Sequence, residues 1–334
     1  MAKKYYIGLD VHKDQTTYAV KDWDGATVAS GKTATQFADL QNVLGEYIGE
    51  AIVAMEACTS YYSLYKKMKE KEIDVHVANV LQLRKVIGKN DRLDSERLAD
   101  MLRLKIMPES YIPEDKVQNL RVLINLYHNS VEENVRYQNQ IHAVLDRNGN
   151  QIQCRDIFSK KGLIRIKQYL QMNNDFALRN LVAAFDYSEQ RKENLKCEIT
   201  AYLNINFKEE YELLKSIPGI GETIAGYLIA EICPLDRFVN KRKLRRYAGV
   251  VPISEKSDKK VYATYLPKHA SRSLLRYALV LAANCAVRTS CRLQKYYQKK
   301  KKGGTHGQAI MCVASSMSDI VYNVLRSKKA YPRS

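Results

Sequence analysis

The fold is decided by the stretch Tyr-Tyr-Ile-Gly-Leu-Asp at residues 5–10, an apolar run that ends on a carboxylate. Its length and its aromatic and branched side chains predict a β-strand. Strand-like runs follow at 16–21 and 27–30, and the turn residues 23–25 (Trp-Asp-Gly) between them predict an antiparallel pair. We therefore expect the chain to begin with three antiparallel strands.

Helical and strand patterns alternate after this start. Apolar side chains at helical spacing predict a helix over 37–48, followed by a buried strand at 51–55, a helix at about 60–71 and a strand at 74–78. Three antiparallel strands followed by parallel ones match the ribonuclease-H-like plan better than a doubly wound sheet. The sequence thus predicts an α/β domain over residues 1–110.

A long helix without glycine or proline is predicted from about residue 116 to 144. Its seam residues step by three and four, which is heptad-like, but they are polar in the middle. Such a seam serves pairing with a partner about as often as packing within one chain, so a helical hairpin and a coiled-coil arm both remain open. We expect a helical domain over 111–210 and, from the arm, a homo-oligomer (dimer or tetramer).

A third, mostly helical domain is predicted over 211–334. The run Ser-Ile-Pro-Gly-Ile-Gly at 216–221, between two helical patterns, is typical of a helix-hairpin-helix motif. Gly219 and Gly221 permit a tight turn, and the N–H groups at the start of the next helix can meet a phosphate. A purely structural turn is the alternative.

Positive charge is concentrated in the last third of the chain. The whole chain has a formal net charge of +18, whereas residues 237–334 hold 23 Lys and Arg against 3 Asp and Glu. A polyanion is the natural partner of such a segment, because binding it releases condensed counterions. The alternative is a solvated, solubilising face, although such faces usually mix both signs.

The expected nucleic-acid contacts fall into a few groups. Arg272 and Arg276 lie four residues apart on a predicted helix and can meet phosphates, or form a solvated helix face. Residues 299–302 are four lysines before Gly303 and Gly304, and predict a flexible basic loop that contacts the backbone of nucleic acid. The expected basic contacts are Lys256, Lys259, Lys260, Lys268, Arg272, Arg276, Lys299, Lys300, Lys301 and Lys302.

Composition excludes several classes of protein. At 334 residues and 46% hydrophobic content, two or three globular domains are expected. No run approaches eighteen apolar residues, and the start of the chain lacks the apolar core of a signal peptide, so no membrane association is expected. The seven cysteines are scattered without a C-x-x-C pair, which indicates neither zinc nor a disulfide framework. We expect a cytoplasmic, nucleoid-associated protein of a bacterium or archaeon.

Four carboxylates form the candidate metal site. Asp10 and Glu56 each end an apolar strand, while Asp91 and Asp94 are three residues apart at a predicted helix start, a spacing that places both on one helical face. Converging acids of this kind suit two Mg²⁺ ions, which can clamp the attacking and leaving oxygens of a phosphodiester. Helix capping is the alternative for Asp91, and a dipole contact for Asp94. His12 is expected to be a neighbour of the site and not a ligand.

These motifs resemble a known family. Gly-Leu-Asp-Val-His-Lys at 8–13, Val-Ala-Met-Glu-Ala at 53–57 and the segment 89–99 around Asp91 and Asp94 are similar to the N-terminal half of DEDD insertion-sequence transposases (the IS110 group) and of the related Piv-type DNA invertases. The hairpin at 216–221 and the segments 244–252 and 268–278 resemble their C-terminal half. The likeness covers nearly the whole chain.

The resemblance implies more than the residues alone. Asp10, Glu56, Asp91 and Asp94 would be ligands of Mg²⁺, with Mn²⁺ as a substitute, in a domain like the RuvC junction resolvase. A nucleophilic serine follows the Gly-x-x-Pro segment in the family; Ser257 has that spacing here, with Asp258 where glycine is usual, and Ser254 is the second candidate. The family mechanism forms a phosphoserine link to DNA and is guided by a structured RNA from the element itself.

Three hypotheses follow for the function. The first is a transposase or recombinase that uses both the metal site and Ser257. In its favour, Lys256, Lys259 and Lys260 would stabilise the charge that develops on a phosphate, although an ordinary loop serine is the alternative on chemistry alone. The second is a ribonuclease-H-type nuclease or junction resolvase in which water attacks. The third is a non-catalytic nucleic-acid-binding protein.

Overall fold

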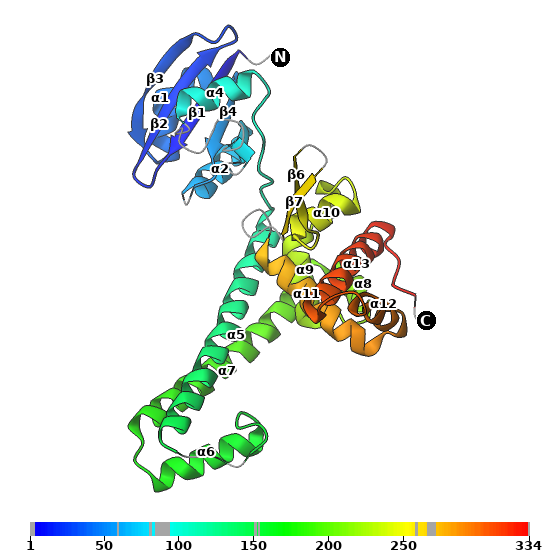
Figure 1. The fold of residues 1–334 in the computed structure, drawn as a ribbon. Helices are drawn as coiled ribbons and strands as arrows, with labels where there is room; N and C mark the ends of the chain where they lie inside the picture. Colours follow the sequence, from blue (N-terminus) through cyan, green and yellow to red (C-terminus); the bar gives the residue numbers. More distant parts are fainter. Residues whose placement is uncertain are drawn as a thin grey trace. The chain divides into compact units, whose positions relative to one another are not determined.

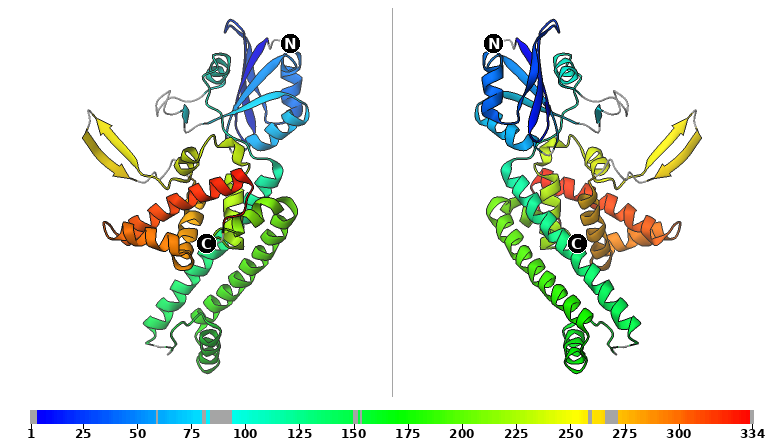
Figure 2. Two further views of the ribbon diagram at one scale, coloured as in Figure 1. Left: turned by 90° about the vertical axis from the view of Figure 1, so that its right-hand side faces the viewer. Right: turned by 90° about the vertical axis from the view of Figure 1, so that its left-hand side faces the viewer.

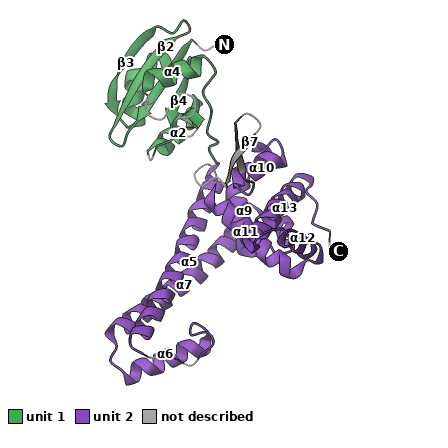
Figure 3. Ribbon diagram, in the orientation of Figure 1, with its two compact units in different colours: residues 1–112 green, residues 113–334 purple. Residues whose placement is uncertain are grey.

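The computed structural model describes residues 4–58, 60–79, 82–83, 94–149, 152, 154–257, 260–265 and 272–332, with the backbone alone at 253–257 and 260–265. The chain divides into two compact units, Met1–Ile112 and Pro113–Ser334 (Figure 3). The expected three-domain division is finer than this, and its boundary near residue 210 stays a prediction.

The first unit is built on a five-stranded mixed sheet (Figure 1). Its strands are β1 (Tyr5–Val11), β2 (Gln15–Asp22), β3 (Thr27–Ala34), β4 (Ala51–Glu56) and β5 (Asp74–Ala78). Their spatial order is β3-β2-β1-β4-β5. β2 runs antiparallel to β1 and β3, whereas β4 runs parallel to β1 and β5. This arrangement is consistent with the expected ribonuclease-H-like plan.

Helices cover both faces of the sheet (Figure 2). One face carries Ile7 and Leu9 and packs against α1 (Phe37–Ile48) and α2 (Tyr61–Glu70). The other face packs against α4 (Ser95–Arg103) through a small apolar cluster. Because side chains alternate along a strand, Tyr6, Gly8 and Asp10 of β1 all belong to the α4 face.

Helix α4 lies unusually close to β1 because Gly8 has no side chain. A Cβ atom at Gly8 would lie 1.9 Å from the carbonyl oxygen of Ser95 and 2.8 Å from the backbone nitrogen of Ala99. An ion pair also ties α4 to β2, where Lys21 Nζ lies 2.5 Å from Asp100 Oδ2. Since the Lys21 side chain is only 9% exposed, this pair is shielded from water and fixes the position of α4.

The second unit contains a long helical hairpin. Helices α5 (Asp115–Arg147) and α7 (Phe176–Asn206) lie side by side, and α6 (Lys160–Met172) lies at their far end (Figures 1 and 2). Apolar residues of all three helices form a separate small core there, which includes Ile141, Ile166 and Phe185. The far end of the arm is therefore stabilised by its own core.

The polar middle of the predicted seam is buried between α5 and α7. Ser188 Oγ donates to Asn134 Oδ1, and Asn134 Nδ2 donates to Glu189 Oε2. Lys192 Nζ donates to both oxygens of Glu189 at 2.7 and 2.8 Å. The seam therefore serves packing within the chain, which favours the helical hairpin over the coiled-coil arm; self-association stays a prediction.

The rest of the second unit is a helical body with one continuous core. Its helices are α8 (Lys208–Lys215), α9 (Glu222–Ile232), η1 (Leu235–Arg237), α10 (Lys241–Ala248), α11 (Ser273–Thr289), α12 (Cys291–Lys301) and α13 (His306–Ser327). A hairpin of β6 (Ile253–Ser257) and β7 (Lys260–Tyr265) interrupts this helical order. Among the described residues, no helix combines the length and apolar character needed to cross a bilayer.

Candidate metal edge and basic nucleic-acid interface

Asp10 and Glu56 end neighbouring parallel strands at the same edge of the sheet. The register pairs Gly8 with Ala54 and Leu9 with Met55, so Asp10 and Glu56 follow as the next positions. Both lie on the α4 face, two residues beyond Gly8 and Ala54. The Asp10 side chain is 27% exposed and Glu56 is half-buried, so each carboxylate is partly shielded from water while it remains accessible.

Asp94 comes to this edge through α4. It is the N-cap of that helix, and its Oδ1 accepts a hydrogen bond from the backbone nitrogen of Arg97 at 2.8 Å. Because the next residue, Ser95, lies against Gly8, Asp94 is positioned over β1 near the strand end that carries Asp10. Asp94 precedes the helix, so the expectation that it lies on a helical face is wrong; Asp91 lies outside the described residues.

Three of the four expected carboxylates therefore come from elements that meet at one edge. Their oxygens are the ligand type that Mg²⁺ prefers, so the donor set fits a divalent ion in kind. Within the described part of the chain, no three His, Cys, Asp or Glu side chains are grouped closely enough to hold an ion as they stand. His12 Nε2 lies 3.3 Å from Asp10 Oδ2, which agrees with the expected role of a neighbour.

Ser257 is the last residue of β6 and lies opposite Lys260 in the β6–β7 register. Only residues 258 and 259 separate these two positions in sequence, so Ser257 belongs to the end of a hairpin and not to an irregular loop. Ser254 lies opposite Thr264, three residues further from that end. Lys259 and Lys268 lie outside the described residues, and for Lys256 and Lys260 the backbone alone is described.

The chain segment that carries this hairpin is tied at both ends to α10. At its start, Gly249 is left-handed with φ +65°, and the Val250 nitrogen donates to the Arg245 oxygen at 3.3 Å. At its end, the Arg272 nitrogen donates to the Tyr247 oxygen at 3.2 Å. The segment therefore leaves and rejoins the helical body at one place.

The Arg272 guanidinium is held by a buried carboxylate. Arg272 is the N-cap residue of α11. Its Nε lies 2.8 Å from Oε2 of Glu231 on α9, and its Nη2 lies 3.4 Å from Oε1 of the same carboxylate. Glu231 is 4% exposed. The half-buried Arg276 follows one turn later. Arg272 is therefore bound to a buried carboxylate while its own side chain stays 45% exposed, and its contact with a phosphate stays a prediction.

The two glycines of the 216–221 turn have different surroundings. Gly219 has φ +86°, and a Cβ there would lie 2.5 Å from the Ala282 oxygen and the Ala286 nitrogen of α11. Gly221 caps α9 with φ −94°, and no atom lies within 4 Å of the position that a Cβ would take there. Gly219 therefore has the structural role considered above, while a phosphate contact at Gly221 stays a prediction.

The lysines at 299–302 do not form a loop. Lys299, Lys300 and Lys301 are the last turn of α12, and Lys302 is its C-cap. All four are exposed, and positive charge is favourable at the carboxyl end of a helix because it interacts with the terminal carbonyl groups. Lys300 Nζ also lies 5.6 Å from the centre of the Tyr296 ring. The basic character remains, but it is presented by an ordered helix end.

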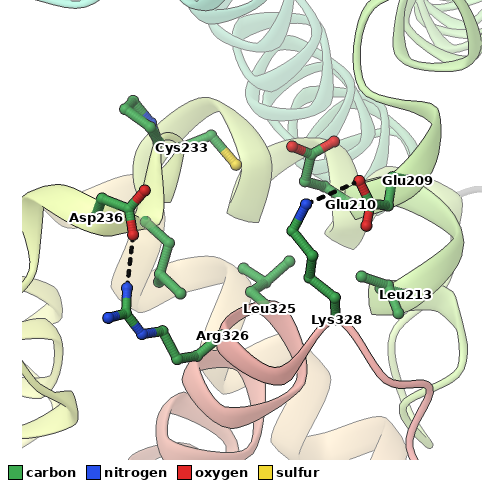
Figure 4. A pocket seen from close by; sticks show the side chains of 10 residues that line it. Glu209, Glu210, Leu213, Cys233, Asp236, Leu325, Arg326 and Lys328 are labelled. Atoms are coloured by element: carbon green, nitrogen blue, oxygen red, sulfur yellow. Dashed lines mark hydrogen bonds and ion pairs between the residues drawn. The ribbon is translucent and has the colours of Figure 1, made fainter.

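A separate hollow between α8, α9 and α13 carries acidic and basic groups in pairs (Figure 4). Arg326 Nη1 lies 2.6 Å from Asp236 Oδ1, and Lys328 Nζ lies 3.4 Å from Glu209 Oε2. Cys233 lines the same hollow. Burial, followed by the nearby Glu210 charge, raises the pKa of the Cys233 thiol to about 12. This thiol is therefore protonated at neutral pH and is no nucleophile.

Cys233 is expected to resist alkylation in the folded protein. Iodoacetamide at pH 8 should modify the exposed Cys197, Cys285 and Cys291, because their thiols are accessible, and leave Cys233 unmodified until the protein is denatured. The measurement is peptide mass spectrometry of native and denatured samples. Native modification of Cys233 at the rate of Cys197 would contradict its burial.

Two protein-family models match the sequence. A DEDD transposase model of IS110, described as "Transposase", matches residues 7–149. A second model, described as "Transposase IS116/IS110/IS902 family", matches residues 211–298. The first match covers most of the sheet and helix α5, and the second covers the helical body from within α8 to within α12, including the β6–β7 hairpin.

Individual relatives align as well. The "Insertion element IS116 uncharacterized 44.8 kDa protein" of Streptomyces clavuligerus is 21% identical over 98% of this chain and 96% of its own length. The "Transposase for insertion sequence element IS1111A" of Coxiella burnetii is 20% identical over 97% of this chain and 90% of its own. The IS110 protein of Streptomyces coelicolor is 24% identical, but the match spans only 47% of this chain and 38% of that protein. The chain belongs to the IS110/IS116/IS902 family of transposases and is a DNA transposase or recombinase.

Proposed function

We propose that this transposase cuts and exchanges DNA strands with a divalent-metal site at the edge formed by Asp10, Glu56, Asp91 and Asp94, and with Ser257 as nucleophile. The observation that carries the proposal is the convergence of β1, β4 and the start of α4, which brings Asp10, Glu56 and Asp94 to one edge on one face. The DEDD family match over residues 7–149 supports divalent-metal use in general.

The carboxylates would hold Mg²⁺, for which Mn²⁺ is expected to substitute. The ion would supply charge stabilisation to the phosphate oxygens while the reaction proceeds. Asp94 already has one oxygen bound to the start of α4, so its carboxylate is held in a fixed direction by the helix. Asp10 and Glu56 are fixed by strand pairing. Strand pairing and the start of α4 thus fix the backbone positions of these three residues, and an ion would have to draw their carboxylates closer together.

Ser257 would attack a backbone phosphate. The Oγ–P bond forms while a P–O bond of the DNA breaks, and the proton lost by Ser257 is balanced by the proton that the leaving sugar oxygen takes up. A sugar hydroxyl of another strand then attacks the phosphoserine and releases Ser257, so the phosphodiester energy is conserved. In support, the register places Lys260 opposite Ser257 at the end of the hairpin. The resemblance to the family further implies that the metal site acting with this serine comes from a partner subunit.

Two partners complete the proposal. A homo-oligomer would bring Ser257 of one subunit to the metal edge of another. A structured RNA from the element would guide the choice of DNA target, and this rests on the resemblance to the family and on the net positive segment 237–334. Lys299, Lys300, Lys301 and Lys302 at the end of α12 would contact nucleic-acid backbone.

A covalent protein–DNA adduct is the decisive test of the proposed function. Wild type, Ser257→Ala, Ser254→Ala and Asp10→Ala would be incubated with labelled junction DNA of the element and the co-purified RNA, then run on a denaturing gel. We expect the wild type to form the adduct with Mg²⁺ and not with EDTA. Both Ser257→Ala and Asp10→Ala should lower it on the order of a thousandfold or more, because each removes a group acting at the reacting atoms.

Ser254→Ala is the matched control, since it removes the same hydroxyl from the same strand. Its adduct should equal that of the wild type. An adduct lost only in Ser254→Ala would move the nucleophile to that residue. Cleavage without an adduct, lost in Asp10→Ala and kept in Ser257→Ala, would instead show a metal nuclease in which water attacks.

A further inference from the structure

A polar hollow lies in the second unit where α5, α9 and the start of α11 meet. Its polar lining is Arg121, Asn125, His128, Glu132, Glu231, Arg272 and Ser273, and its volume is ≈ 470 Å³. This is within the range of ordinary ligand pockets. The hollow is separate from the metal edge, which belongs to the first unit, and five of its seven polar residues come from outside the motifs that the sequence singled out.

The buried Glu231 carboxylate of this hollow is bound by Arg272, whereas Arg121 lacks an acceptor for one of its nitrogens among the described residues. Arg272 uses both oxygens of Glu231, at 2.8 and 3.4 Å. Arg121 Nε donates to the Ala230 oxygen at 2.8 Å, and its Nη2 is buried without an acceptor among the described residues. The Glu132 carboxylate at the rim is 70% exposed and lies 3.5 Å from His128 Nε2, too solvated to neutralise Arg121. Glu231 is thus already bound by Arg272, and one buried nitrogen of Arg121 has no acceptor among the described residues.

The burial of Arg121 also affects the pKa of its guanidinium group. Its pKa is lowered by burial, while Glu231 opposes the shift and the charges of Arg272 and Arg237 add to it. A buried donor without an acceptor is unfavourable by about 1–3 kcal/mol, more when it is charged. An anion in the hollow would supply the acceptor that Arg121 Nη2 lacks among the described residues.

The start of α11 faces the same hollow. Ser273 and Leu274, its first two residues, are part of the lining. In this helix of 17 residues, all of them described, the first turn has no acidic residue, and the Arg272 side chain forms no capping hydrogen bond. The described N-cap side chain thus leaves the N–H groups of the first turn uncapped, and the positive end of the helix dipole lies behind them.

We propose that this hollow binds a phosphate group of a nucleic-acid strand, through the guanidinium groups of Arg121 and Arg272 and the first turn of α11. The inference rests on the proposed function, because it takes nucleic acid as the partner of the basic segment 237–334. The paired N–H donors of an arginine guanidinium group match the spacing of phosphate oxygens. The Asn125 amide and the Ser273 hydroxyl in the lining are further donors. The hollow then fixes the strand beside Arg272, where the segment that carries Ser257 rejoins the helical body.

The proposal is tested by measuring how tightly the full-length protein binds a nucleic-acid strand after a negative charge is introduced at the start of α11. Ser273→Asp introduces a carboxylate at an exposed first-turn position, where negative charge favours the helix, so the protein should fold. Ser273→Asn is the matched neutral control. With a labelled single-stranded oligonucleotide of the element end and fluorescence anisotropy, we expect Ser273→Asp to weaken binding at least tenfold and Ser273→Asn to change it less than twofold.

Arg121→Gln provides a second readout that does not depend on affinity alone. Removing one phosphate contact should lower the slope of log affinity against log salt concentration by about 1. Arg136→Gln, on the same helix α5 but outside the lining of the hollow, should leave the slope unchanged. Unchanged binding in Ser273→Asp together with an unchanged slope in Arg121→Gln would overturn the proposal.

Inorganic phosphate distinguishes the source of the phosphate group. If it raises the melting temperature of the wild type and not of Ser273→Asp, while oligonucleotide binding is equal in both, the hollow takes free phosphate and the strand proposal is wrong. The adduct gel separates this inference from the proposed function. An adduct formed normally by Ser273→Asp with normal strand binding refutes the hollow alone, whereas a missing adduct in the wild type refutes the serine mechanism alone.

Discussion

Gly8→Ala is expected to destabilise the first unit by about 3 kcal/mol or more and to lower DNA cleavage at least about 100-fold. The added Cβ would lie 1.9 Å from the Ser95 oxygen and 2.8 Å from the Ala99 nitrogen. These are backbone atoms of α4, which cannot rotate away as a side chain can. The helix must therefore move off the sheet, and the Asp94 cap moves with it.

The loss of cleavage follows from geometry as well as from stability. A displacement of about 1 Å in a catalytic group is enough to lower a rate about 100-fold. Urea unfolding and the cleavage assay with Mg²⁺ measure the two effects separately. Gly45→Ala in α1 is the matched control, because nothing lies within 4 Å of a Cβ there. It should stabilise the unit by about 0.5–1 kcal/mol, since alanine favours a helix. Wild-type stability and cleavage in Gly8→Ala would show that α4 does not rest on β1.

Gly219→Ala should destabilise the second unit by about 2–5 kcal/mol, which combines left-handed backbone strain with overpacking. Its φ of +86° disfavours any side chain, and the Cβ would lie 2.5 Å from two backbone atoms of α11. The turn and α11 would have to separate, opening the core that α9 and α11 share. Thermal unfolding followed by circular dichroism measures the loss.

Gly221→Ala, two residues away, is the control for Gly219→Ala. Its φ of −94° suits alanine and no atom lies within 4 Å, so the melting temperature should stay within about 2 °C of the wild type. A similar loss in both variants would mean that the turn is sensitive as a whole and that the contact between Gly219 and α11 is not the cause.

Much of the first unit could be predicted from its sequence. The helix Phe37–Ile48 and the strand Asp74–Ala78 have the expected bounds, because each is a periodic or apolar run with clear ends. Strand β3 extends to Ala34, beyond the expected residue 30. It is the edge strand of the sheet and alternates between exposed and half-buried positions, so its last residues lack the apolar signal on which the prediction depends.

The hairpin β6–β7 has a clear sequence signal in only one of its two strands. Residues 261–265 (Val-Tyr-Ala-Thr-Tyr) combine branched and aromatic residues in the manner of a strand. The preceding strand contains Ser254, Glu255, Lys256 and Ser257, which show no alternation of apolar and polar residues. The second strand alone carried the signal, and a strand without a visible partner is hard to assign.

The two candidate sites differ in how far the sequence could predict them. Asp10 and Glu56 were predictable because a carboxylate at the end of an apolar strand is conspicuous. The cluster of Arg121, Glu231 and Arg272 was not, because Arg272 is 41 residues from Glu231, and Arg121 is 109 residues from Ala230, whose carbonyl it contacts. Only the packing of α5 and α11 against α9 brings these residues together.

Helix α5 belongs to two cores at once. Its first turns, with Leu120 and Ile124, are part of the core of the helical body, and its last turns, with Ile141, are part of the core at the far end of the arm. At 33 residues it is a single rod about 50 Å long. The buried bond between Asn134 and Ser188 keeps α5 from sliding along α7. The two cores are therefore joined by one unbroken helix, and any shift of α5 along α7 would disturb the packing at both ends at once.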